Sequence, residues 1–279
     1  MSQEAAPTEA VLLVEDIGHV RRLTMNRPKA LNALNRDLTD AMSDALRDAE
    51  ADEDVRVIVL RGAGRAFCAG YDLTEDADEG ELDAAHWHDS LKASVATMLE
   101  FTDCAKPTIA QVHSYCLAGG TDLMLACDLA VAADDAKFGY VDVRFGSGVV
   151  SMFLPWVVGV RAAKEMLFTG EDRIRADEAL RIGLVNRVVP ADELDAATLG
   201  LADEIAKNEP FVVQTTKRAV NRVWDVSGFR AAMAANVELD VMIETANLPA
   251  RDEFRRITNE EGLKKAIEWR DAKFRGAQG

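Results

Sequence analysis

The chain has 279 residues, a formal net charge of -16 and four cysteines without a CxxC pair or zinc-like spacing. This length supports a large core, whereas the acidic balance argues against a nucleic acid partner, because phosphate binding draws on clustered Lys and Arg. With no apolar run of about 20 residues and no signal-peptide pattern at the start, we expect a cytoplasmic protein with reduced thiols, no metal and no membrane contact.

Extended and helical patterns alternate through the first part of the chain. The branched apolar run at 55–64, which ends at Gly62 and Gly64, is typical of a strand buried on both faces. Apolar residues at helical spacing, as in 31–52, indicate helices. The predicted strands are 10–16, 19–28, 55–64, 107–118, 129–134 and 137–141, and the predicted helices are 31–52, 91–101 and 119–128. Strands alternating with helices predict the α/β class with a largely covered sheet.

The last part of the chain reads as helical. The predicted helices are 158–170, 175–184, 193–208, 211–224, 229–247 and 260–274, with one further strand at 185–190. No linker rich in Gly, Ser or Pro interrupts this part of the sequence. We therefore place a soft boundary between a core at 1–204 and a helical region at 205–279, which packs on the core or on another subunit.

Two short segments contain backbone amides suited to a developing negative charge. Gly119 and Gly120 lie between a predicted strand and a helix, where N–H groups at the positive end of the helix dipole suit an oxyanion or a phosphate. The same pair also suits a closely packed turn. In FCAGYDL, Gly70 lets the backbone approach a ligand, so that the amide of Tyr71 can be a second donor to one acyl oxygen.

Two aspartates stand among apolar neighbours. Asp122 begins an otherwise apolar helix, and Asp142 lies between Val141 and Val143. A buried carboxylate costs free energy unless it is paired, so both are candidates for function. The structural alternatives are that Asp122 complements a helix dipole and that Asp142 caps the next helix.

Six blocks in order carry a resemblance to a known family. They are RPKALNAL, GRAFCAGYDL, KPTIAQVHSYCLAGGTDLMLACD, FGYVDVRFG, TGEDRIRADEALRIGLVNRVV and EGLKKAIEW. Together they resemble the enoyl-CoA hydratase/isomerase (crotonase) superfamily, from about Arg27 to Phe274. The resemblance implies a core of repeated ββα units with a C-terminal helical trimerisation region, in a homotrimer or a hexamer made of two trimers.

The resemblance also implies the ligand and its site. The substrate would be an acyl-CoA thioester whose carbonyl oxygen is held by the amides of Tyr71 and Gly119, with no cofactor beyond the coenzyme A of the substrate. The remaining substrate-binding residues that we predict are Lys29, Ala30, Leu31, Cys68, Ala69, Gly70, Asp72, Leu73, Gly120, Tyr140, Lys273 and Phe274. For Asp72, capping of the following turn is the structural alternative.

The reaction implied by the resemblance is hydration of a 2-enoyl-CoA. Asp122 and Asp142 fall where typical hydratases carry two glutamates that hold a water between them. Because each side chain is one methylene shorter, an enoyl-CoA or dienoyl-CoA isomerase and an acyl-CoA hydrolase are alternatives. The further acid that dienoyl-CoA isomerases carry after the second position is missing from VRFGSGVVSM. An alternative of another class is a non-catalytic acyl-CoA binding protein.

The large apolar residues leave two interpretations open. Trp87, Met98, Phe153 and Trp156 could line an acyl pocket or belong to the core. We place Trp87, with His86 and His88, in a loop.

Overall fold

The computed structural model describes residues 10–75, 82–148 and 152–275. Its larger sheet has the strand order β1-β2-β3-β5-β7-β10, in which β1 and β2 are antiparallel and the other neighbours are parallel. These strands are β1 (Leu12–Ile17), β2 (Val20–Met25), β3 (Val57–Gly62), β5 (Thr108–Val112), β7 (Leu129–Ala133) and β10 (Arg187–Val189). The α/β class is confirmed.

A smaller sheet is formed by strands that lie between those of the larger sheet along the chain. Its order is β4-β6-β8-β9, from β4 (Ala66–Cys68), β6 (Tyr115–Leu117), β8 (Lys137–Gly139) and β9 (Ile174–Arg175). Three times, a strand of the larger sheet is followed within a few residues by a strand of the smaller one. Since β4, β6 and β8 are parallel, their carboxyl ends meet at one edge and deliver the segments that follow them to the same place.

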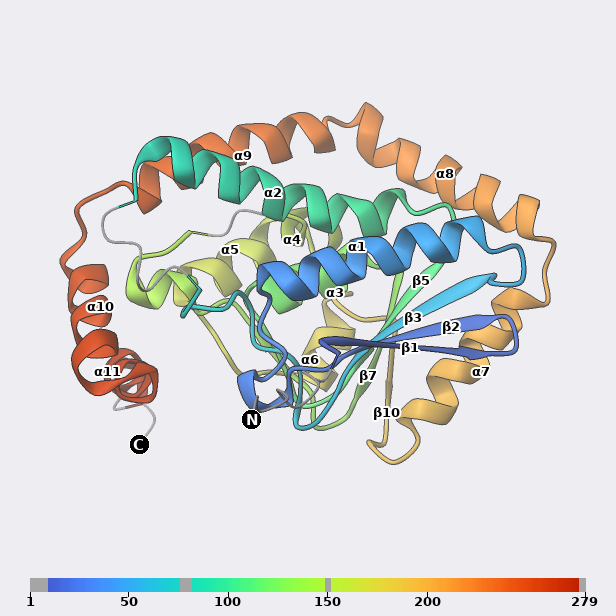
Figure 1. Cartoon of the computed structure of the whole chain (residues 1–279), viewed down its shortest axis with the longest axis horizontal. Coiled ribbons are helices and arrows are strands. Elements are labelled where there is room, and N and C mark those ends of the chain that lie inside the picture. The colour runs from blue at the N-terminus through green and yellow to red at the C-terminus, as the bar shows by residue number, and fades with distance from the viewer. Residues whose placement is uncertain (1–9, 76–81, 149–151, 276–279) are drawn as a thin grey trace, which may run out of the picture.

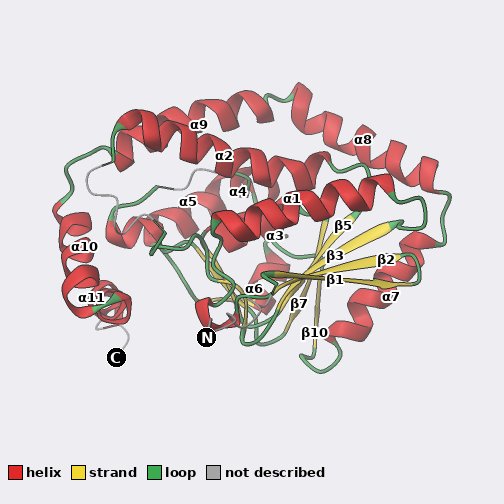
Figure 2. Ribbon diagram, viewed as in Figure 1, coloured by secondary structure: helices red, strands yellow, loops and turns green. Residues whose placement is uncertain are grey.

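Helices cover both faces of the larger sheet (Figures 1 and 2). The helices are α1 (Arg36–Ala51), α2 (Ala84–Asp103), α3 (Gly119–Ala126), α4 (Leu154–Val157), α5 (Gly159–Thr169), α6 (Ala176–Arg181), α7 (Leu194–Ala206), α8 (Pro210–Val226), α9 (Phe229–Glu244), α10 (Pro249–Glu261) and α11 (Leu263–Arg275), with 3-10 turns η1 (Pro28–Ala30) and η2 (Asp142–Phe145).

Alternation along β3 explains the two cores. Ile58 and Leu60 face the main core, which also contains side chains of α1, α2 and α3, whereas Val57 and Val59 face a smaller core closed by α7. Because both faces of β3 carry branched apolar residues, helices pack on both faces of the sheet. The predicted boundary after residue 204 falls in the last turn of α7.

Three expectations about local structure were wrong. The predicted strand 107–118 is two strands in different sheets, because Ser114 adopts a φ of 51° that ends one ladder and starts the other. The helix expected at 91–101 begins at Ala84, where the Asp83 carboxylate accepts from the N–H of His86, so His86, Trp87 and His88 are helical. The chain after residue 248 forms α10 at Pro249–Glu261 as well as the predicted terminal helix, which begins at Leu263 rather than at residue 260.

Among the described residues, no helix is long and apolar enough to cross a membrane. Within the same residues, no group of three or more His, Cys, Asp or Glu side chains is arranged to hold a metal ion.

Candidate active site

The segments after β4 and β6 bring the two predicted amide donors together. Leu34 N–H donates to Gly70 O at 2.8 Å and Asp72 N–H donates to Leu34 O at 2.9 Å, so the N–H of Tyr71 points away from Leu34. Gly70 has a φ of 105°, and a Cβ built there would lie 3.4 Å from Gly119 N. Gly119 begins α3, so its N–H has no acceptor within the helix. The two amides therefore belong to adjacent segments.

Close packing explains the glycines of this junction. A Cβ built on Gly119 would lie 2.6 Å from Cε2 of Tyr71, and one on Gly120 would lie 2.5 Å from the carbonyl oxygen of Cys68. Ala118, just before them, adopts a φ of 50°, a conformation that costs about 1–3 kcal/mol and that persists only where surrounding structure enforces it. The same backbone conformation thus suits both interpretations, a closely packed turn and N–H groups that can contact an anion.

Asp122 lies in the first turn of α3, with only 2% of the residue exposed. Tyr140, which follows β8 and is fully buried, donates its hydroxyl hydrogen to Asp122 Oδ1 at 2.7 Å. Burial raises the pKa of Asp122 well above its usual range, against the lowering effect of this hydrogen bond, and the charge of Asp142 adds to the increase. Burial therefore favours the protonated form of the Asp122 carboxyl group.

Asp142 starts η2, directly after β8 and Tyr140. Its Oδ2 is buried and has no hydrogen-bond partner among the described residues. Burial raises its pKa to about 7, with Arg270 lowering it and Glu244 raising it. A carboxyl group that titrates near neutral pH with one unused oxygen is suited to proton transfer.

One cleft of about 1790 Å³ joins these groups. This exceeds the roughly 300–1,000 Å³ of pockets for drug-sized ligands, so a longer ligand can fit. The predicted residues that line it are Ala30, Leu31, Ala69, Tyr71, Asp72, Leu73, Gly119, Asp122 and Asp142. Cys68, Gly70, Gly120 and Tyr140 stand behind this lining and shape it through the contacts described above.

Three further predicted residues neither line the cleft nor stand behind its lining. Lys29 is exposed on η1. Lys273 lies 4.6 Å above the ring of Trp269, and Phe274 stacks with the Arg144 guanidinium at 4.4 Å, so both contact their own chain on α11 and η2. Asp72 lines the cleft, pairs with Arg27 at 2.8 Å and accepts from Thr74 N–H and Oγ1, which confirms the predicted turn cap.

The four large apolar candidates separate into two groups. Trp87 and Met98, both on α2, line the cleft. Phe153 and Trp156 instead pack edge-on against Phe229 of α9 in the core. The acyl-pocket interpretation therefore fits Trp87, and the core interpretation fits Phe153 and Trp156. Met98 fits both, because it lines the cleft and is buried in the main core.

Two carboxylates that the sequence analysis missed reach the cleft from α9. Asp240 is 3% exposed, and Glu244 accepts from Ser147 Oγ at 2.5 Å and from Gly148 N–H at 3.1 Å. Burial raises the pKa of Asp240 to about 7, and Glu244 and Asp142 contribute to the increase. One signal could have found Asp240, because it falls on the face of α9 that also carries buried Met233 and Val237.

The three raised carboxyl groups predict a falling stability as the pH rises. In the unfolded chain Asp122, Asp142 and Asp240 ionise near pH 3.9. In the folded protein the pKa of Asp142 and of Asp240 is about 7, and that of Asp122 is raised well above its usual range. The folded state therefore binds more protons across this window, and the free energy of unfolding decreases from pH 5 to pH 8. Calorimetry at four pH values should show a falling Tm, with a shallower slope for Asp240→Asn; a flat profile would contradict these protonation states.

Comparison with known proteins identifies the class of enzyme. Residues 16–277 match the family model for enoyl-CoA hydratase/isomerase. The chain belongs to this family.

Individual relatives cover most of the chain. A short-chain-enoyl-CoA hydratase of Clostridium acetobutylicum is 38% identical over 217 residues, which cover 76% of this chain and 81% of that protein. An (E)-benzylidenesuccinyl-CoA hydratase of Thauera aromatica is 33% identical over 95% of this chain and 98% of its own. The crystal structure of an enoyl-CoA hydratase/isomerase from Xanthobacter autotrophicus Py2 aligns with a TM-score of 0.92 at 41% identity, covering 95% of this chain and 99% of that one.

Proposed function

We propose that this protein is an enoyl-CoA hydratase, which adds water across the C2=C3 bond of a 2-enoyl-CoA. The observation that carries the proposal is the convergence of three parallel strands on one cleft. β4 leads to the amide of Tyr71, β6 leads to that of Gly119, and β8 leads to Asp142 beside Asp122. A relative named as a short-chain-enoyl-CoA hydratase and one named as an (E)-benzylidenesuccinyl-CoA hydratase support the same reaction.

The proposed chemistry follows from what each group can stabilise. The amides of Tyr71 and Gly119 donate to the thioester oxygen, which gains negative charge as the enolate forms. The water, held by Asp122 and Asp142, loses a proton to a carboxylate while its oxygen bonds to C3. A protonated carboxyl group then gives a proton to C2 of the enolate. The reaction needs no cofactor beyond the coenzyme A that is part of the substrate.

An isomerase is the second candidate, and Asp240 favours it. Dienoyl-CoA isomerases carry a third acid, which the sequence after Asp142 lacks, and α9 supplies a third carboxyl group to the cleft instead. Such an enzyme would take a proton from one carbon of the acyl chain and return it to another. The mass of the product separates the two candidates, since hydration adds one water and isomerisation adds nothing.

The experiment is a panel of thioesters followed by mass spectrometry and ultraviolet absorbance. The panel contains straight, branched and aromatic 2-enoyl-CoA esters, with 3-enoyl and dienoyl esters beside them. A product one water heavier, with loss of the enoyl absorbance, is expected. Tight binding without turnover of any member would instead identify a non-catalytic acyl-CoA binding protein and end the hydratase proposal.

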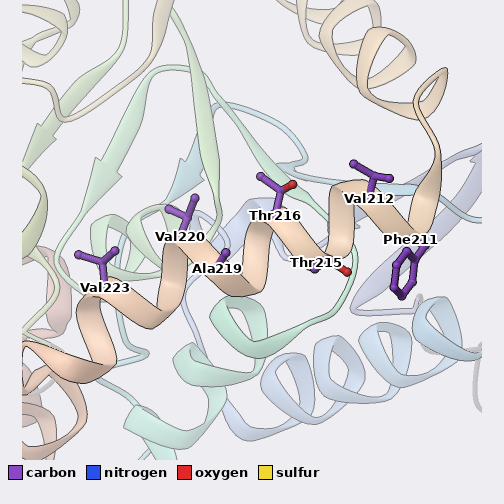
Figure 3. A pocket seen from close by; sticks show the side chains of 7 residues that line it. All are labelled: Phe211, Val212, Thr215, Thr216, Ala219, Val220 and Val223. Carbon is purple, nitrogen blue, oxygen red and sulfur yellow. The ribbon is translucent and has the colours of Figure 1, made fainter.

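We further infer a homotrimer, alone or paired into a hexamer, in the cytoplasm. An apolar face of α8 supports assembly: Val212, Thr216, Val220 and Val223 form a row along it (Figure 3). Val220 and Val223 are 63% and 61% exposed in the single chain, which is costly for a surface that stays in water.

Charging this face is expected to break the assembly. A Val220→Asp/Val223→Asp variant would place two carboxylates in an apolar interface, so sedimentation should show a monomer in place of the trimer. The control is Arg187→Asp, an exposed position on β10, which should leave the mass unchanged. A wild-type protein that sediments as a monomer would contradict the proposed trimer.

A further inference from the structure

We propose that Asp240 is a third acid–base residue of the site, which shares one titrating proton with Asp142 and moves the two protons of hydration together with it. This inference rests on the proposed hydratase function. It also changes the role of Asp122, which becomes the group that orients the water through its bond to Tyr140.

The geometry of Asp240 carries the proposal. The residue lies on α9, more than a hundred residues from Asp122 in sequence, yet it lines the same cleft. It is 3% exposed, and its buried Oδ1 has no hydrogen-bond partner in the part of the chain that the structure describes. Burying such an oxygen unpaired costs about 1–3 kcal/mol, which a purely structural carboxylate would recover by bonding to a neighbour.

Asp142 and Asp240 form a matched pair, whereas Asp122 differs from both. Each of the first two has one buried carboxylate oxygen without a partner among described residues, namely Oδ2 of Asp142 and Oδ1 of Asp240. Asp122 instead has an oxygen occupied by Tyr140. Burial raises the pKa of both groups to about 7, and Glu244 and Asp142 add to the increase at Asp240. With one proton held between the two carboxyl groups, one of them is a base while the other is an acid.

The cation that acts on Asp240 is bound to other groups. The charged groups that act on Asp240 are Asp142 from η2, Asp122 from α3, Glu244 from α9 and Arg251 from α10. Arg251 is committed to Glu244 at 3.3 Å and to backbone carbonyl oxygens. On the side of α2, His88 pairs with Glu238 rather than with Asp240.

The proton balance closes over one turnover. The ionised member of the pair takes a proton from water as the water oxygen bonds to C3, and the C2=C3 electrons move into the thioester enolate. The protonated member gives its proton to C2, and the enolate electrons form the new C–H bond. The two carboxyl groups have then exchanged charge states, and transfer of one proton between them through the next water restores the pair.

The test compares Asp240→Asn with Glu238→Gln, an exposed carboxylate on the same helix. Asp240→Asn is expected to lower kcat about a hundredfold with little change in KM, because it removes proton transfer and leaves the thioester contacts. The pH profile of kcat/KM is expected to be bell-shaped around pH 7 in the wild type and to lose one limb in the variant. Deuterium uptake at C2 of the hydrated product in heavy water should slow to match. Glu238→Gln should equal the wild type in all three measurements.

A second variant tests the position of the carboxyl group without touching it. A Cβ built on Gly148 would lie 1.5 Å from Asp240 Oδ1, so Gly148→Ala must displace this oxygen. Gly148→Ala should therefore lose most of the activity in the wild type but little more in the Asp240→Asn background.

Each outcome has a distinct meaning. If the wild type hydrates an enoyl-CoA and Asp240→Asn keeps its kcat and both limbs of the profile, the role of Asp240 is refuted while the hydratase remains. A raised KM at constant kcat would make Asp240 a substrate contact and also overturn the proposal. If the wild type converts no thioester at all, the proposed function fails first and this inference fails with it.

Discussion

Asp142→Asn is expected to lower kcat by about two to four powers of ten while binding of the thioester stays near normal. The amide occupies the space of the carboxylate at the start of η2, but it can neither accept the proton of water nor return one to carbon. Because the pKa of Asp142 is raised by burial, removing its charge does not weaken the fold. Steady-state kinetics with the best thioester of the panel, together with calorimetric titration of a product analogue, measure the two effects separately.

The matched control for this variant is Asp134→Asn. Asp134 is an exposed aspartate between β7 and β8, away from the residues that line the cleft. It should retain full activity. An Asp142→Asn protein with unchanged turnover would place the chemistry on other groups of the cleft and remove the basis of the proposed mechanism.

Elements whose pattern is local could be predicted from the sequence. β3 is a short branched run that glycine ends, and α1 repeats apolar residues at helical spacing, so each is specified by neighbours in the chain. The division of 107–118 into β5 and β6 could not be read in this way. It depends on a left-handed Ser114, without the glycine that usually marks such a turn, and on which sheet each half joins.

The same distinction applies to the site. Tyr71, Gly119 and Asp142 could be nominated from the sequence because each lies in a block that resembles the family. The parallel arrangement of β4, β6 and β8 brings these segments to one edge. Asp240 belongs to no such motif. It reaches the cleft only because α9 packs along α2, which is a tertiary contact between distant segments. Reading the buried face of α9 could nominate it, but its proximity to Asp142 requires the fold.

The environment of the acids also lies beyond sequence reasoning. The shortened side chains raised the question of whether a water could still be held between Asp122 and Asp142. In the structure, α9 adds the carboxyl groups of Asp240 and Glu244 to the cleft. Asp122 and Asp142, although each is one methylene shorter than a glutamate, therefore have further acids beside them. Burial is the largest cause of the raised pKa values of Asp122, Asp142 and Asp240, and neighbouring carboxyl groups of the cleft add to the increase.

Gly119→Ala is the second large expected effect, with a loss of kcat/KM of about a hundredfold to a thousandfold. The new Cβ would lie 2.6 Å from Cε2 and 2.8 Å from Cδ2 of Tyr71, so the ring must move and carry its backbone with it. Since both amides must point at one oxygen, a shift of either removes much of the stabilisation of the enolate. The loss should appear in kcat as well as in KM, because the amides act most strongly on the charge of the transition state.

A double-mutant cycle isolates the cause. Tyr71→Ala removes the ring but keeps the amide, so Gly119→Ala should cost far less in that background than in the wild type. Gly200→Ala on α7 is the control, because a Cβ there meets nothing within 4 Å, and its activity should equal that of the wild type. If removal of the Tyr71 ring restores nothing, the clash is not the cause, and if Gly119→Ala is fully active, the amide of this residue does not hold the thioester oxygen.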